Sequence, residues 1–171
     1  MTHGLQIRPL NDADPEVMER AFSAIGWSKP ASQFRRYLGE QSAGTRSCWV
    51  AILNQTFAGY VTVNWKPPYP AFAEYGIPEI QDLNVLSSFR RKGIASALLD
   101  FAETEVAPRS ELVGIAVGLH PGYNAAQKLY GKRGYIPDGR GITYKLRSVQ
   151  EGEQVTLDDS LLLHLTKRIR C

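Results

Sequence analysis

A run of six residues constrains the fold of this chain more than any other feature. The run is Arg90-Arg91-Lys92-Gly93-Ile94-Ala95. It follows Glu79–Val85, which has the composition of a strand, and it precedes residues 94–107, whose apolar side chains recur at helical spacing on one face. The chain must therefore turn sharply from a strand into a helix here, with a glycine and three cationic side chains at the turn.

A turn of this composition favours an anion. Glycine lets another group approach the backbone closely, and the first amides of a helix point outward without a partner inside the helix. The helix dipole and the cationic side chains add positive potential, which suits a phosphate or pyrophosphate. The run is neither a P-loop nor a dinucleotide fingerprint, because it contains a single glycine and no Gly-Lys-Ser/Thr follows. An ordinary strand–helix junction with surface arginines is the alternative.

Two sequence blocks resemble one known family. Arg90-x-x-Gly93-x-Ala95 resembles the Gln/Arg-x-x-Gly-x-Gly/Ala pyrophosphate loop of the GNAT superfamily of acyl-CoA N-acyltransferases. A second block is similar to the family's Asn-x-x-Ala-x-x-Leu-Tyr-x-x-x-Gly-Phe segment, through Ala126, Leu129-Tyr130 and Gly134-Tyr135. Both blocks occur in the family's order and on the expected elements, so the resemblance extends over most of the chain.

The second block departs from the family at one position. Tyr123 stands where the family usually has asparagine, and Asn124 follows one residue later. Either the asparagine is displaced by a different turn after His120-Pro121-Gly122, or Tyr123 makes a different contact. Both alternatives are open at this stage.

The resemblance also implies an architecture. The expected fold is α/β, of α+β type, with a mixed, mostly antiparallel twisted sheet of six to seven strands flanked by about four helices. In this family two central parallel strands splay apart in a V that admits the pantetheine arm; here they would be Glu79–Val85 and Leu112–Leu119. The patterns place strands near 5–7, 47–53, 57–65, 79–85, 112–119, 135–136, 142–146 and 161–169, and helices near 14–25, 30–40, 94–107 and 124–133. Residues 67–78 read as a loop.

Composition narrows the class of protein. With 171 residues, 43% of them hydrophobic, the chain fits one domain over residues 1–171 with a sizeable core. A net charge of +3 is too small to imply nucleic acid, and no apolar run approaches the ~20 residues that span a bilayer. No signal peptide is recognised. We therefore expect a cytoplasmic monomer or homodimer that binds neither membrane nor nucleic acid.

No metal site is expected. Two cysteines make neither a disulfide framework nor a cysteine-rich zinc site. The three histidines, His3, His120 and His164, lie far apart without ligand spacing.

The resemblance assigns the cofactor to acetyl-CoA as co-substrate. Backbone amides from Arg91 to Ser96 would bind its pyrophosphate. The amide of Leu83, two residues before the strand ends, would donate a hydrogen bond to the developing oxyanion from a strand bulge. The full set of expected cofactor-binding residues is Leu83, Asn84, Val85, Arg90, Arg91, Lys92, Gly93, Ile94, Ala95, Ser96 and Asn124.

Transfer of an acyl group to an amine also needs proton transfer. The incoming ammonium, with a reference pKa of ~10, must lose a proton, and Glu79 resembles the family's strand glutamate that acts as general base. Tyr130 matches the tyrosine that protonates the leaving thiolate. Strand alternation would place Asp82 on the face opposite Glu79, in a structural role. The alternatives are a solvated Glu79, a half-buried Tyr130 with its hydroxyl satisfied elsewhere, and a proton relay through His120.

The sequence thus predicts a GNAT-family N-acetyltransferase that transfers an acetyl group from acetyl-CoA to a primary amine in a ternary complex. A small molecule is favoured as acceptor, since no appended domain for recognising a protein is seen, and a cationic one, since the segments that bind the acceptor in this fold carry aromatic and acidic residues. One alternative is a protein N-terminal or lysine acetyltransferase. Alternatives of other classes are a non-catalytic acyl-CoA-binding sensor and a nucleic-acid module that reads phosphates with Arg90, Arg91 and Lys92.

Overall fold

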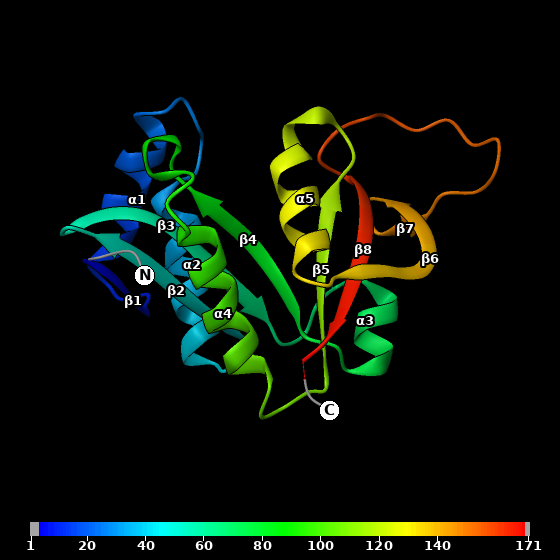
Figure 1. Cartoon of the computed structure of the whole chain (residues 1–171), viewed down its shortest axis with the longest axis horizontal. Coiled ribbons are helices and arrows are strands. Elements are labelled where there is room, and N and C mark those ends of the chain that lie inside the picture. Colours follow the sequence, from blue (N-terminus) through cyan, green and yellow to red (C-terminus); the bar gives the residue numbers. More distant parts are fainter. Residues whose placement is uncertain (1–3, 170–171) are drawn as a thin grey trace. The chain divides into compact units, whose positions relative to one another are not determined.

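The computed structural model describes residues 4–169 and groups them into two compact units. The first unit contains residues 4–65 and 80–105, and the second contains residues 66–79 and 106–169. Figure 1 shows the elements, which are β1 (Leu5–Pro9), α1 (Asp14–Ser23), α2 (Ala31–Ser42), β2 (Arg46–Leu53), β3 (Thr56–Asn64), α3 (Pro70–Tyr75), β4 (Glu79–Val85), η1 (Ser87–Phe89), α4 (Ile94–Val106), β5 (Leu112–Gly118), η2 (Pro121–Tyr123), α5 (Asn124–Lys132), β6 (Ile136–Tyr144), β7 (Arg147–Ser148) and β8 (Leu161–Arg168).

The strands of the first unit follow one another in chain order. β1 pairs antiparallel with β2, and β2 pairs antiparallel with β3. The β2–β3 hairpin turns at Asn54 and Gln55, both at positive φ (49° and 64°), as the tightest right-twisted hairpins require. Next to β3 lies β4, where the amide of Leu86 donates to the carbonyl of Ala58 at 2.9 Å.

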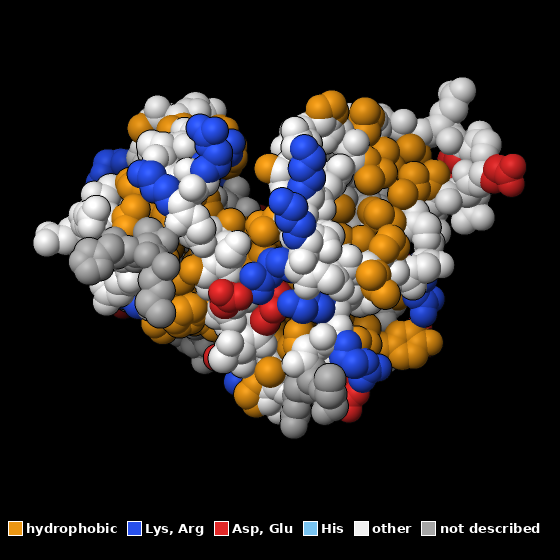
Figure 2. All heavy atoms as spheres, viewed as in Figure 1, with side chains coloured by type: hydrophobic (Ala, Val, Ile, Leu, Met, Phe, Trp, Pro, Cys, Tyr) orange, Lys and Arg blue, Asp and Glu red, His pale blue; other side chains and the backbone are white. Residues whose placement is uncertain are grey.

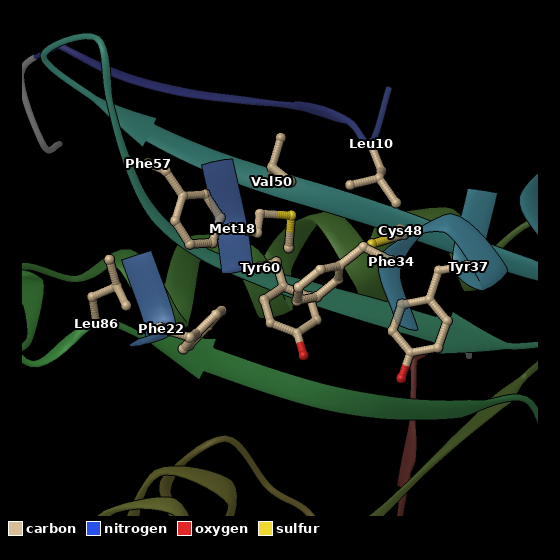
Figure 3. Packing of buried hydrophobic residues seen from close by; sticks show 10 residues of the cluster. All are labelled: Leu10, Met18, Phe22, Phe34, Tyr37, Cys48, Val50, Phe57, Tyr60 and Leu86. Carbon is tan, nitrogen blue, oxygen red and sulfur yellow. The ribbon is translucent and has the colours of Figure 1, made fainter. Parts of the chain in front are cut away.

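Aromatic rings fill the core between α1, α2 and the strands of the first unit (Figure 3). Phe22 of α1 is its centre, with ring centroids of neighbouring aromatic residues 5.8 to 6.4 Å away. Phe34 of α2 meets Tyr60 of β3 edge to face at 5.4 Å. Each fully buried ring contributes about 2–3 kcal/mol, so this cluster fixes both helices against the strands.

In the second unit, β8 is the central strand. It pairs antiparallel with β5 on one side and with β6 on the other, and β6 pairs with β7. Phe72 of α3 packs on Gly114 of β5, and the ring of Tyr123 packs on Gly118 of the same strand. α5 runs along β5 (Figure 1), where the Gln127 amide donates to the carbonyl of Gly118 at 2.9 Å.

His164 of β8 is fully buried in the second unit. Tyr69 stacks on its ring at a centroid distance of 3.6 Å, and Phe72 meets it edge-on at 5.5 Å. Neither ring nitrogen has a hydrogen-bond partner among the described residues. Burial lowers the pKa of His164 to about 4, so the imidazole is neutral near pH 7 and packs as an aromatic plate.

The structure corrects several sequence-based expectations. Residues 4–169 contain eight strands and five α-helices, rather than six to seven strands and about four helices. The additions are β7 and the helix α3, which lies in a segment expected to be a loop. The two pieces expected at 135–136 and 142–146 form one strand, β6, with a bulge between Pro137 and Ile142. The single-domain boundary and the splay of β4 from β5 stay predictions.

Within residues 4–169, no helix is long and apolar enough to cross a bilayer.

Candidate active site

The turn before α4 has an unusual backbone. After η1, Arg90 is extended, with φ −66° and ψ 159°. Arg91 and Gly93 are left-handed, with φ of 61° and 75°, and α4 begins at the next residue, Ile94. Successive amides in such a conformation form a concave, anion-binding nest. The sequence-predicted turn therefore has a backbone suited to a phosphate group.

The amides of this turn are open. The first hydrogen bond into α4 comes from the Ala97 amide, which donates to the carbonyl of Gly93 at 3.0 Å. Over residues 4–169, no acceptor is recorded for the amides of Gly93, Ile94, Ala95 and Ser96. Arg90, Arg91 and Lys92 are exposed beside them. Figure 2 shows Lys and Arg side chains gathered on the surface where Figure 1 draws this turn.

Arg90 is held in place by two contacts. Its Nε donates to the carbonyl of Val85 at 3.3 Å, and its guanidinium lies 5.9 Å from the ring centroid of Trp27. Trp27 stacks in turn on Phe22 of the first unit's core, at 6.0 Å. Arg90 therefore links the predicted pyrophosphate loop to the segment between α1 and α2.

The strand that leads into the turn is irregular. Leu83, Asn84 and Val85 are half-buried, and Asp82 before them has a φ of 53° inside the strand. A left-handed residue at this point produces a bulge and breaks the alternation of side chains. The structure thus places a strand irregularity directly before the amide that the sequence assigned to the oxyanion.

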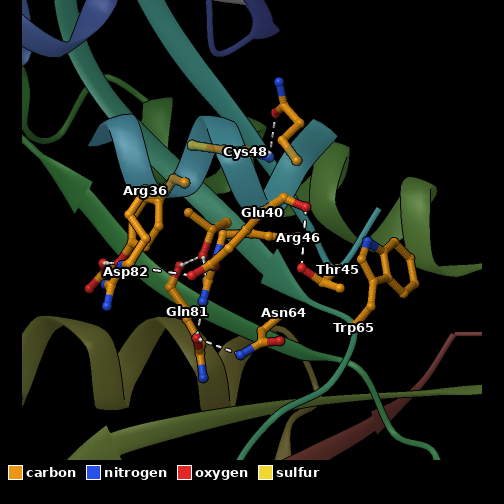
Figure 4. A network of polar contacts seen from close by, with 12 residues as sticks. Arg36, Glu40, Thr45, Arg46, Cys48, Asn64, Trp65, Gln81 and Asp82 are labelled. Atoms are coloured by element: carbon orange, nitrogen blue, oxygen red, sulfur yellow. Dashed lines mark hydrogen bonds and ion pairs between the residues drawn. The ribbon is translucent and has the colours of Figure 1, made fainter. Parts of the chain in front are cut away.

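The irregularity brings Gln81 and Asp82 into one polar network (Figure 4). Arg46 donates to the Gln81 side chain at 3.1 Å, and its guanidinium lies 4.5 Å from the Tyr37 ring centroid. The Tyr37 hydroxyl donates a short hydrogen bond to the Asp82 carboxylate. Asp82 and Gln81, although adjacent in the strand, thus reach the same network, because alternation does not continue through a left-handed residue.

Burial, followed by the charge of Asp82, raises the pKa of Tyr37 well above its usual range. The phenol therefore stays protonated and remains a donor to the carboxylate.

Glu79 begins β4 and is only 4% exposed, so the alternative of a solvated glutamate is wrong. Its charge contributes to the raised pKa of Tyr69, about 12, whose larger causes are burial and a hydrogen bond from the Tyr69 hydroxyl to Asp138 at 2.8 Å. A buried carboxylate beside aromatic residues has the setting of a functional acid or base.

Tyr130 lies in α5 and is 6% exposed, which excludes a half-buried ring. Burial is the main cause that raises the pKa of its phenol above the usual value, and Tyr123 adds to it. The phenol is thus protonated at neutral pH, as a general acid must be before it acts.

The turn before α5 is filled by its own side chains. His120 Nδ1 accepts from the Gly122 amide at 3.1 Å, so Nε2 carries the proton and donates to Asp159 Oδ1 at 2.9 Å. The Tyr123 hydroxyl donates to the same oxygen at 3.1 Å. Tyr123 therefore makes a contact of its own, and Asn124 opens α5 as an exposed residue. Nothing here supports a proton relay through His120.

Sequence reasoning missed the group around Asp82. Gln33, Tyr37 and Lys29 approach its carboxylate from the α2 region, and no spacing in the sequence marks them as partners of β4. Within the described residues, no cluster of His, Cys, Asp and Glu is arranged to hold a metal ion.

The comparisons with known proteins agree with this geometry. The sequence model of the Acetyltransferase (GNAT) family matches residues 13–135, which is more than half of the chain. The chain belongs to the GNAT acetyltransferase family. No curated protein matches it in sequence.

Solved structures of GNAT-fold enzymes share its architecture. An N-acetyltransferase from Staphylococcus aureus Mu50 has a TM-score of 0.73 at 19% identity, covering 97% of this chain and 99% of that one. The ribosomal-protein alanine N-acetyltransferase from Escherichia coli has a TM-score of 0.69 at 15% identity, covering 98% and 95%. Arabidopsis thaliana NAA60 in complex with acetyl-CoA has a TM-score of 0.69 at 17% identity, covering 96% and 98%. The α+β GNAT fold predicted from the sequence is thereby confirmed.

Proposed function

We propose that this GNAT acetyltransferase transfers an acetyl group from acetyl-CoA to the primary amine of a small cationic molecule, directly and within a ternary complex. The observation that carries the proposal is the turn before α4, with its two left-handed residues and with the amides of Gly93, Ile94, Ala95 and Ser96 lacking an acceptor among residues 4–169. A complex of a similar structure, NAA60, with acetyl-CoA supports the choice of donor.

The first unit supplies the groups for holding the cofactor. The amides from Arg91 to Ser96 would receive the pyrophosphate, and Arg90 would add charge without having to be ordered on binding, because Trp27 and Val85 already hold it. The amide of Leu83 would donate to the carbonyl oxygen of the thioester as negative charge develops there.

Two buried residues would move the protons. Glu79 would accept the proton of the incoming ammonium, directly or through water, before the amine attacks the thioester carbon. When the tetrahedral intermediate collapses, the carbon–sulfur bond breaks, and Tyr130 would donate its proton to the departing thiolate. The burial of both residues, at 4% and 6% exposure, supports these roles.

The class of acceptor is the least determined part of the proposal. A cationic amine suits the buried carboxylate of Glu79. The E. coli neighbour is named for acetylation of a ribosomal-protein alanine, and this favours a protein N-terminus as the second candidate. A panel of polyamines, amino sugars, amino acids and peptides decides between them.

The test of the proposal is release of free CoA from acetyl-CoA in the presence of that panel. Turnover with a small amine and none with peptides is the expected result. Binding of acetyl-CoA without turnover on any amine or peptide would instead indicate a non-catalytic sensor.

Two variants then test the assigned roles. We expect Tyr130→Phe to lower kcat by at least about tenfold with an unchanged Kd for acetyl-CoA, since general acids contribute about 10²–10⁴-fold. Tyr75→Phe, at a residue 64% exposed, is the matched control. Equal turnover in Tyr130→Phe would remove that residue from the mechanism.

Glu79→Gln is expected to lower activity most at low pH, where the amine is most fully protonated and the need for a base is greatest. Glu74→Gln, at an exposed position of α3, is the control. An unaltered pH profile in Glu79→Gln would show that another group or bulk water removes the proton.

A further inference from the structure

Asp82 is held in a strained conformation at the centre of the first unit. Six described residues other than glycine have positive φ, and five of them lie in turns between elements. Asp82, at 53°, is the one inside a strand over residues 4–169. A left-handed residue that is not glycine is strained, and it persists only where the surroundings enforce it.

The contacts of the Asp82 side chain enforce this left-handed conformation. The Tyr37 hydroxyl and the Gln33 side-chain amide both donate to carboxylate oxygen Oδ2, the amide at 3.2 Å. Gln33 also donates to the Tyr37 hydroxyl at 3.1 Å, which locks the two donors together one helical turn apart on α2. The ammonium of Lys29 lies 3.9 Å from the other carboxylate oxygen.

Tyr37, one of the residues that hold Asp82, is itself buried and fixed by further contacts. Tyr37 is 5% exposed, and the guanidinium of Arg46 lies over its ring. Arg46 is 8% exposed and bonds to Glu40 of α2, to Thr62 of β3 at 2.8 Å and to Gln81 of β4 at 3.1 Å. Arg46 thus ties the ring of Tyr37, whose hydroxyl donates to the Asp82 carboxylate, to α2, β3 and β4 (Figure 4).

The backbone conformation of Asp82 decides where the next amide points. The peptide that joins Asp82 to Leu83 is oriented by the Asp82 dihedral angles, so an extended Asp82 would turn the Leu83 amide toward a different side. We propose that Asp82 is a positioning residue: Gln33, Tyr37 and Lys29 hold its carboxylate, and through it aim the Leu83 amide at the thioester oxygen. The inference rests on the proposed function, since it assumes that Leu83 donates to that oxygen.

The expected effect is on turnover, and not on cofactor affinity. An oxyanion donor contributes about 10²–10³ in kcat, and a misplacement of about 1 Å costs about 100-fold. Loss of the Asp82 carboxylate should therefore lower kcat by about 10- to 100-fold, whereas the pyrophosphate turn and the Kd for acetyl-CoA stay as they are.

Three variants separate positioning from general stability. Asp82→Ala removes every anchor. Asp82→Asn keeps an oxygen for Tyr37, and asparagine tolerates the left-handed region, so its kcat should stay within about threefold of the wild type. Tyr37→Phe removes one anchor and leaves Asp82 in place, and it should fall between the two. Asp14→Asn is the matched control, because this buried carboxylate, paired with Arg8 at 2.7 Å, stabilises the same unit without touching β4.

The direct readout is the infrared carbonyl stretch of bound acetyl-CoA labelled with ¹³C at the thioester carbon. In the wild type the band should shift to lower frequency than in free acetyl-CoA, since the carbonyl accepts a hydrogen bond. In Asp82→Ala it should return toward the free value, and Asp82→Asn should restore the shift. Asp14→Asn should lower the melting temperature and leave both the band and kcat unchanged.

The outcomes distinguish the two hypotheses. Wild-type protein that neither binds acetyl-CoA nor acetylates any acceptor would defeat the proposed function itself. A wild-type band shift and turnover that Asp82→Ala leaves intact would overturn the positioning role alone. So would an Asp82→Asn variant as impaired as Asp82→Ala, because charge rather than conformation would then be what matters.

Discussion

The two turns that lead into α4 and α5 have the same order of elements but differ in whether the protein itself provides partners for their polar groups. Each follows a strand, passes through a short 3₁₀-helix and leads into a helix N-terminus. Before α4 the amides are open and cationic side chains surround them. Before α5 the His120 ring accepts from the Gly122 amide, and Asp159 accepts from His120 and Tyr123. One turn leaves its early amides without a partner among residues 4–169, and the other is closed by side chains of the protein.

The comparison shows that a helix N-terminus alone does not define an anion site. Both helices have a dipole and early amides, but an acidic residue is already hydrogen-bonded beside the α5 turn. The protein also encloses polar atoms in the interior of the second unit, where the ring nitrogens of His164 are buried away from solvent. Each of the following predictions tests one side of this contrast.

The largest effect is expected from Gly93→Asp. The φ of 75° favours glycine, and the added carboxylate would repel the pyrophosphate. We expect CoA affinity to fall by at least about 100-fold by calorimetry. Gly44→Asp is the control, because Gly44 has a φ of 73° and open space around it but lies in the turn between α2 and β2. If both variants bind CoA as the wild type does, the turn before α4 is not the pyrophosphate site.

The buried imidazole of His164 should make the protein sensitive to acid. Its folded pKa, about 4, lies below the ordinary histidine value of 6.5, so the unfolded state binds more protons between these values and stability rises with pH in that window. About 3 kcal/mol of unfolding free energy should therefore be lost as the pH falls from 7 to 4. Urea titrations across this range measure it, and His164→Phe should flatten the slope. Parallel slopes for the two proteins would contradict the assignment.

Arg90→Ala should weaken CoA binding by roughly tenfold, since it removes one charge-assisted contact and leaves the amides of the turn in place. The weakening should shrink at high salt, where the wild type also loses this charge contact. Arg20→Ala, at an exposed arginine of α1, controls for the change in net charge. An effect of equal size in the two variants would show that Arg90 acts only through overall charge.

The smallest effect is expected from opening the second turn. His120→Ala and Asp159→Asn should leave CoA affinity within about threefold of the wild type and cost at most about 1 kcal/mol of stability, because the pair is exposed. The Asp159 pKa is lowered, by the hydrogen bond from His120 above all, so its contribution is present near neutral pH and is lost as the pH falls through the folded pKa. A tenfold change in CoA affinity would show that the turn before α5 also contributes to CoA binding.

Much of the fold could be predicted because its signals are local. The bounds of β4 and the start of α4 at Ile94 follow from an apolar run, a glycine and a helical pattern. α3 was missed, since four prolines between Pro67 and Pro78 indicate a loop; Pro70 stands at the helix start, where proline is tolerated. Asp14-Pro15 has the composition of a helix N-cap followed by a first-turn proline, but Asp14 is the first helical residue and pairs with Arg8, which lies on β1.

The turn of the candidate site could be predicted from the sequence, whereas the tertiary contacts around the site could not. Composition predicts a turn that favours an anion, and the resemblance to the family's loop assigns Arg90, Gly93 and Ala95 to it. The burial of Glu79 depends on segments far from it in sequence, such as the one that carries Tyr69. The left-handed Asp82 has no local signal, because an aspartate within an apolar strand pattern is expected to alternate like any other residue.

Two glycines of β5 leave room for aromatic rings to pack directly against the strand. A methyl group on Gly114 would lie 2.2 Å from the Phe72 ring, and one on Gly118 would lie 2.2 Å from the Tyr123 ring. Sliding β5 by one pleat would bring Ala116 under a ring, which leaves no room for it. Both rings fit only where β5 presents a glycine to each of them. The two glycines therefore keep β5 from shifting along the neighbouring strands.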